Sequence, residues 1–138
     1  MDLGYNRLTS VPAEIGQLTS LEELDLNENQ LTRVPAEIGQ LTLLKELDLD
    51  DNYLTSVPAE IGQLTSLRQL NLSYNKLMSV PAEIGQLTSL SKLWLDGNRL
   101  TSLAAAIREL REAGCYVYLR DGETVDECCR TSQGGLVV

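Results

Sequence analysis

Leucine alternates with polar residues along short stretches of this chain, and the alternation returns at a regular interval. In one such stretch Leu24 and Leu26 alternate with Glu23, Asp25 and Asn27. A period of two predicts a strand with one buried face and one exposed face. Because the pattern recurs every 23 residues, we expect one strand in each repeat, with the exposed polar side chains aligned in columns across neighbouring strands.

The same period governs a longer phrase, Val-Pro-Ala-Glu-Ile-Gly-Gln-Leu-Thr, which occurs four times, at 11–19, 34–42, 57–65 and 80–88. Proline suits the first position of a helical turn, and the glycine four residues later suits its end. We therefore expect a short helical turn, α or 3₁₀, opposite each strand. One coil of this kind cannot bury its apolar residues alone, so the coils must stack around a shared core.

An asparagine stands at one position of each repeat, where the chain turns out of the strand: Asn6, Asn29, Asn52, Asn75 and Asn98. An amide side chain both donates and accepts hydrogen bonds, so it can satisfy backbone groups of neighbouring coils at a buried turn. We interpret this column as structural rather than functional.

The unit Leu-x-x-Leu-x-Leu-x-x-Asn-x-Leu, from Leu21 to Leu31, resembles the leucine-rich repeat. Its length and its Val-Pro-Ala-Glu-Ile-Gly phrase are similar to intracellular repeats of the Ras-group type, which are signalling scaffolds and adaptors. Plant receptor-like repeats share Pro-x-x-Ile-Gly-x-Leu, but have a Gly before an Ile-Pro pair where this chain has Thr-Arg-Val-Pro at 32–35. The resemblance implies an α/β fold: a right-handed leucine-rich-repeat solenoid, with a curved parallel β-sheet on the concave face and short helical turns on the convex face.

The pattern divides the chain into leucine-rich repeats, a C-terminal cap of one helix and one strand, and a flexible tail, at 1–103, 104–122 and 123–138. Met1 falls on the register of Leu24, so we expect the first strand to lack an N-terminal cap. In the cap, helical spacing replaces the proline phrase and Gly114 is a helix stop. Residues 115–119 are predicted to form the last strand, followed by a turn at 121–122.

The net charge of −9 is concentrated near the N-terminus. Residues 1–60 carry twelve acidic and three basic side chains, whereas residues 61–119 carry four acidic and six basic ones. An acidic surface repels phosphate, so we expect no nucleic-acid partner and instead a protein with a basic or mixed surface. We also expect no membrane partner, because no apolar run in the sequence is long enough to span a bilayer.

The outward strand positions are the candidate partner-binding surface. They form four columns: Glu23 and Glu46; Asp25, Asp48, Asn71 and Trp94; Asp50; and Glu28, Asp51 and Tyr74. Parallel strands lie ~4.8 Å apart, so stacked aspartates repel each other by about 1 kcal/mol in water, and a basic partner would relieve that repulsion. The alternative is that these acids are ordinary solvated residues.

Trp94 is the single tryptophan of the chain, and its register points it at the concave face. Exposed tryptophan is enriched at the energetic centres of protein interfaces, so we expect Trp94 to contact a partner. The alternative is that it packs against its neighbours on the strands or against the C-terminal cap.

Catalysis is not expected, because the chain contains no histidine, the commonest general base and metal ligand. Cys128 and Cys129 lack an evident activating partner, and the acidic columns lack the ligand spacing of a calcium loop, so we expect no cofactor and no metal. Three cysteines near one end are a poor disulfide framework and favour an intracellular, cytoplasmic location.

We therefore interpret the chain as a protein–protein interaction module, an adaptor or scaffold that binds its partner on the concave strand face. The alternative is that its coils are spacers in a longer leucine-rich-repeat array, or in a receptor-like protein, whose binding site lies elsewhere.

Overall fold

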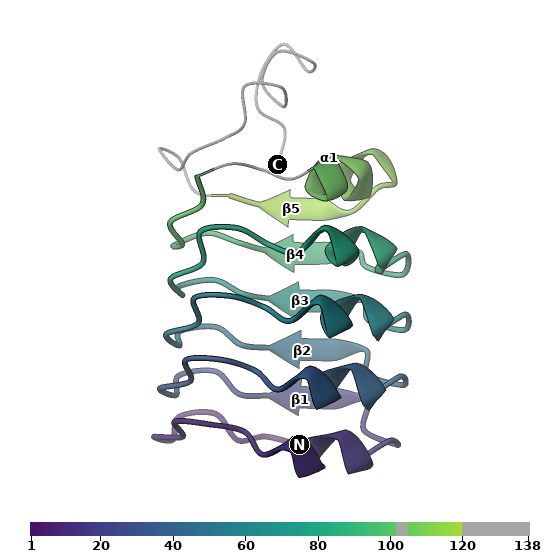
Figure 1. Cartoon of the computed structure of the whole chain (residues 1–138). Helices are drawn as coiled ribbons and strands as arrows, with labels where there is room; N and C mark the ends of the chain where they lie inside the picture. Colours follow the sequence, from purple (N-terminus) through teal and green to yellow (C-terminus); the bar gives the residue numbers. More distant parts are fainter. Residues whose placement is uncertain (102–104, 120–138) are drawn as a thin grey trace.

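The computed structural model describes residues 1–101 and 105–119 as a stack of coils, with strands on one side and short helices on the other (Figure 1). In this part of the chain, five strands form one parallel sheet in sequence order. The strands are β1 (Glu23–Asp25), β2 (Glu46–Asp48), β3 (Gln69–Asn71), β4 (Lys92–Trp94) and β5 (Tyr116–Tyr118). This confirms the predicted α/β solenoid.

The register of the sheet follows the repeat. Asp25 pairs with Asp48, and Asp48 with Asn71, so equivalent residues of successive repeats lie side by side. Asp2 adds an isolated parallel bridge to Asp25 before the first strand. The last pair, Trp94 with Tyr118, joins residues 24 apart instead of 23, because β5 follows a different kind of helix.

The helices between the strands are 3₁₀ helices, one of the two types that the sequence predicted. They are η1 (Ala13–Gln17), η2 (Ala36–Gln40), η3 (Ala59–Gln63) and η4 (Ala82–Gln86). Each proline stands one residue before its helix instead of at the first helical position. Pro35 is extended, with ψ 149°, and its carbonyl accepts the N–H of Ile38 at 3.0 Å, which closes the first turn.

The prediction that glycine ends each of these helices is wrong. Gly39 lies inside η2, and the residue after the helix is Leu41. A Cβ at Gly39 would stand 2.7 Å from the carbonyl oxygen of Glu60 in the next coil, and Gly16 and Gly62 have equally close neighbours. Glycine is therefore needed because adjacent helices approach each other too closely for a side chain.

The end of the described chain departs from the repeat. Helix α1 (Ala105–Glu112) takes the place of a 3₁₀ helix and packs against η4, with Ile107 and Leu110 buried. Gly114 follows it with φ 103°, a left-handed conformation that glycine adopts at least cost. The predicted turn at 121–122, the predicted tail at 123–138 and its cysteines, Cys128 and Cys129, lie outside the described residues.

The core runs along the stack without a break between coils. Leu26, Leu49, Leu72 and Leu95, one from each repeat, are each 0% exposed and belong to one cluster of buried residues. Full burial of such a side chain contributes about 1.5–3 kcal/mol. Because each leucine packs against its counterparts above and below, a coil is stable only within the stack.

The predicted structural role of the asparagine column is confirmed. The Asn52 amide nitrogen donates to the carbonyl of Leu26 in the preceding coil at 3.0 Å and to that of Leu49 in its own coil at 3.1 Å. Its Oδ1 accepts the N–H of Leu31 at 3.1 Å. Asn52 is 3% exposed, so water cannot replace these bonds.

We predict that Asn52→Ala lowers the free energy of unfolding by about 3 kcal/mol, because buried groups left unpaired cost about 1–3 kcal/mol each. Urea denaturation followed by circular dichroism measures the loss. The matched control is Asn6→Ala, since Asn6 holds the same place in the repeat but is exposed; we expect it to lose about 1 kcal/mol or less. Equal losses in the two variants would contradict the role assigned to the buried column.

Candidate functional site

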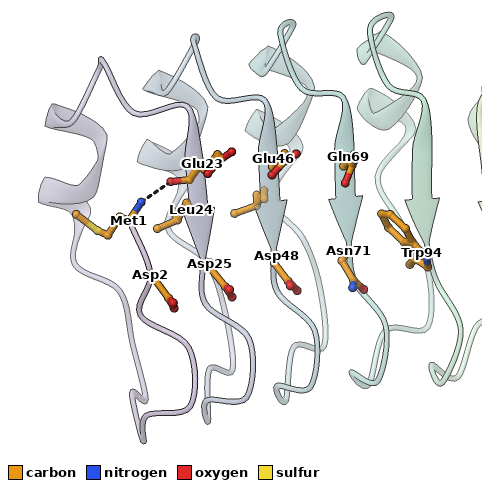
Figure 2. A pocket seen from close by; sticks show the side chains of 11 residues that line it. Met1, Asp2, Glu23, Leu24, Asp25, Glu46, Asp48, Gln69, Asn71 and Trp94 are labelled. Carbon is orange, nitrogen blue, oxygen red and sulfur yellow. Dashed lines mark hydrogen bonds between the residues drawn. The ribbon is translucent and has the colours of Figure 1, made fainter.

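The exposed side of the sheet, called here the strand face, is hollowed into a groove of about 390 Å³ (Figure 2). Two columns of strand side chains line it, Glu23, Glu46 and Gln69 in one and Asp25, Asp48 and Asn71 in the other. Trp94 stands at one end of the groove, and Met1 and Asp2 stand at the other. The volume is near the low end of ligand cavities, which span about 300–1,000 Å³, and suits one or two side chains of a partner.

The aspartates of the groove also hold the backbone. Asp48 accepts the N–H of Asp50 through Oδ1 at 3.0 Å. In a regular ladder that N–H would donate to the carbonyl of Leu26, but this carbonyl already accepts the amide of Asn52. Asp25 makes the same bond to the residue two positions on. Asp25 and Asp48 therefore each supply an acceptor for a backbone N–H, a structural role that the sequence analysis did not predict.

An uncharged acceptor makes the same bond at this column. Asn71 occupies the same position in the next repeat, and its amide oxygen accepts the N–H of Ser73 at the same distance, 3.0 Å. The negative charges of Asp25 and Asp48 are thus additional to what the backbone needs. Partial burial raises the pKa of Asp48, the bond from the N–H of Asp50 lowers it, and the charge of Asp25 raises it further, so the two carboxylates oppose one another.

The charge is most crowded at Asp50, one column beyond the groove. Burial raises the pKa of this carboxyl to about 6, and the nearby acids, Asp48 and Asp51 first among them, act in the same direction. The next residue of its column, Ser73, donates its hydroxyl to Asp96. At neutral pH the Asp50 carboxyl is therefore charged, and this charge lowers the stability of the folded state.

Six of the ten predicted partner-binding residues line the groove: Glu23, Asp25, Glu46, Asp48, Asn71 and Trp94. The other four lie outside it. Asp50 is partly buried beside it. Glu28, Asp51 and Tyr74 lie beyond the ends of the strands, exposed on turns with φ between 52° and 57°, and so follow the strand face without facing its groove.

Trp94 faces the groove, as its register predicts, and it also packs against the C-terminal strand, as the alternative has it; its contact with a partner stays a prediction. It lines the groove, and it also stacks on Tyr118 of β5, with ring centroids 5.2 Å apart and an interplanar angle of 9°. Tyr116 lies beside Tyr118 at 6.5 Å. The sequence analysis missed these tyrosines as site residues. The alternation that buries Val117 and Leu119 is the pattern that could have placed both tyrosines on the strand face.

Other chemistry has little support in the part of the chain that the structure describes. No group of three or more acidic or cysteine side chains there is arranged to hold a metal ion. Burial raises the pKa of the Cys115 thiol to about 11, so it is not a nucleophile at neutral pH. None of the described helices has the length and apolarity needed to cross a bilayer.

Two family models match the chain. Residues 1–74 match a model described as a leucine-rich repeat region, and residues 65–109 match one described as two copies of leucine-rich repeats. No curated protein matches the chain at a significant level. The matched models describe the repeat in general, so the Ras-group subtype stays a prediction.

Solved structures of leucine-rich-repeat proteins resemble the chain. An LRR protein of Leptospira interrogans is 39% identical over 83% of the chain, with a TM-score of 0.59, and the chain spans 34% of that protein. The LRR ectodomain of the receptor kinase SOBIR1 from Arabidopsis thaliana is 26% identical over 91% of the chain, which spans 71% of it, with a TM-score of 0.74. The functional domain of InlJ from Listeria monocytogenes shares the fold, with a TM-score of 0.69 at 22% identity over 92% of the chain and 24% of that domain.

We predict that Asp50→Asn raises the free energy of unfolding at pH 7 by about 1 kcal/mol, a figure discounted for the solvent exposure of this carboxyl. The pKa of Asp50 is raised from 3.8 to about 6 on folding. Between these values the folded state holds a proton that the unfolded state has released, so the contribution of Asp50 to stability falls as pH rises through that window. The gain from the substitution is therefore expected at pH 7 and not at pH 4.

Urea denaturation at the two pH values measures this effect. Glu14→Gln is the control, because it removes one charge from an exposed residue of η1 and is expected to change stability by less than about 0.5 kcal/mol at either pH. A gain from Asp50→Asn that is the same at pH 4 and pH 7 would contradict the assignment.

Proposed function

Because the chain belongs to the leucine-rich-repeat family, we propose that it is a protein–protein interaction module, an adaptor or scaffold, that binds a partner on its strand face. The observation that carries the proposal is the charge of Asp25 and Asp48 in the groove. The backbone needs only an acceptor at that column, as Asn71 demonstrates, and neighbouring charges oppose the fold. A charge that costs stability and serves no bond in the fold is best explained by a partner.

The chemistry of that partner follows from the groove. Four acids face it from β1 and β2, namely Glu23, Glu46, Asp25 and Asp48. A partner with a basic or mixed surface would neutralise them and would be steered toward this end of the sheet by long-range attraction. Phosphate-bearing partners would be repelled.

The proposal places the protein in a reducing, intracellular compartment and gives it no enzymatic activity. The compartment is supported by Cys115, which is a free, buried cysteine. An adaptor of this kind would act through its surface alone.

Affinity capture from a lysate of the source organism, read by mass spectrometry, would supply candidate partners, and calorimetry would then test the site. We predict that the double substitution Asp25→Asn with Asp48→Asn weakens binding of a partner about tenfold, or about 1.4 kcal/mol, and flattens its dependence on salt. Asparagine keeps the backbone acceptor at both positions, so the fold is preserved while two charges are lost.

The matched control is Glu14→Gln with Glu37→Gln, which removes two charges from the helices η1 and η2 on the opposite side. We expect it to leave affinity nearly unchanged. Loss of affinity in the control with no loss in the groove variant would overturn the proposal. It would favour instead the alternative in which these coils are spacers and the binding surface lies elsewhere.

A further inference from the structure

The indole ring of Trp94 lines the groove and is covered on one face by Tyr118. Strand β4 lies between β3 and β5, and the ring is stacked nearly parallel on Tyr118 from the β5 side. The stack therefore runs across the strands, and the opposite face of the indole points toward β3. Figure 2 shows Trp94 at that end of the row of labelled side chains, beside Asn71.

The residues that follow Trp94 along its column toward β1 are polar and then acidic. Asn71 is the next residue of the column, and Asp48 follows one strand further, about 10 Å from Trp94 at ~4.8 Å per strand. Asp48 uses one carboxylate oxygen to accept the backbone N–H of Asp50, and within residues 1–101 and 105–119 its second oxygen accepts no hydrogen bond. An aromatic face and a carboxylate thus border the same space.

We propose that this end of the groove binds an arginine side chain of the partner, with the guanidinium stacked on Trp94 and its positive charge attracted by the acids of the groove, of which Asp48 is the nearest in the Trp94 column. The inference rests on the proposed function and names the residue that the partner inserts. A guanidinium is planar and weakly hydrated, so it can lie flat on an indole while its N–H groups pair with a carboxylate. The ammonium of lysine is a compact, strongly hydrated charge that does only the second of these.

Tyr118 strengthens this platform. Its ring covers one face of the Trp94 indole, with the ring centroids 5.2 Å apart, and so restricts the indole to one orientation. Little side-chain freedom is then lost when a guanidinium stacks on the indole. Lys92 is expected to weaken the binding of a cation, because its own positive charge repels it. It lies two positions before Trp94 and is the one basic side chain among the residues of β1 to β5. A bound cation must tolerate that charge, which makes the position a useful probe.

Two peptides of equal charge, tetra-arginine and tetra-lysine, test the proposal on the full chain. Trp94 is the single tryptophan, so its fluorescence reports binding at this place alone, and calorimetry gives the affinities. We expect tetra-arginine to bind about fivefold more tightly than tetra-lysine, within the range of a partly desolvated cation–π contact, and to change the tryptophan emission more strongly.

The variants separate the aromatic face from the charge. Trp94→Leu is expected to abolish the preference for arginine, while Lys92→Gln is expected to tighten the binding of both peptides about twofold by removing a like charge. If Trp94→Leu does not fold, Trp94→Tyr replaces it; tyrosine is a weaker cation–π partner, so the preference should fall about twofold.

The outcomes distinguish the two proposals. Equal affinity for the two peptides, or a preference for arginine that survives both Trp94 variants, overturns the arginine site. If binding in that case still weakens with Asp25→Asn and Asp48→Asn, the acidic groove and the proposed function stand. If neither peptide binds the wild-type chain, both the arginine site and a groove that selects basic partners are overturned.

Discussion

The hydrogen bonds of the buried asparagines are the constraint on which the rest of this structure depends. Each one ties two coils together through carbonyls such as those of Leu26 and Leu49. Because the Asn52 amide occupies the carbonyl of Leu26, the N–H of Asp50 is left without that carbonyl as its partner. Asp48 accepts this N–H instead. The polar lining of the groove therefore begins as a consequence of the turn, because buried backbone groups must be paired.

At two positions the side chains of the groove exceed this requirement. An amide suffices as the acceptor, as Asn71 shows, so the carboxylates at Asp25 and Asp48 add only charge and mutual repulsion. Along the sheet from β2 to β5, these acids are followed by Asn71 and then by the stacked rings of Trp94 and Tyr118. The strand face thus has a charged end and an aromatic end.

The close stacking of the coils is what keeps these columns straight. Glycine at Gly39 lets η2 approach the backbone of Glu60 in the next coil, and the buried leucines keep the strands in register on the other side. A regular stack places equivalent side chains one strand spacing apart. The strand face can therefore carry a linear pattern of chemistry because the core behind it is repetitive.

The sequence by itself determined the repeat, the strand positions, the asparagine column and the outward register of Trp94, because these follow from a spacing of 23 residues and a period of two. Only the tertiary structure decided the role of Gly39, the backbone bond of Asp48, the raised pKa of Asp50 and the stack of Trp94 on Tyr118. The first, third and fourth depend on how closely the coils pack, and the bond of Asp48 depends on a backbone N–H that the ladder between coils leaves unpaired. Periodicity along one chain specifies which residues are neighbours, but not how closely they approach or which of their groups remain unpaired.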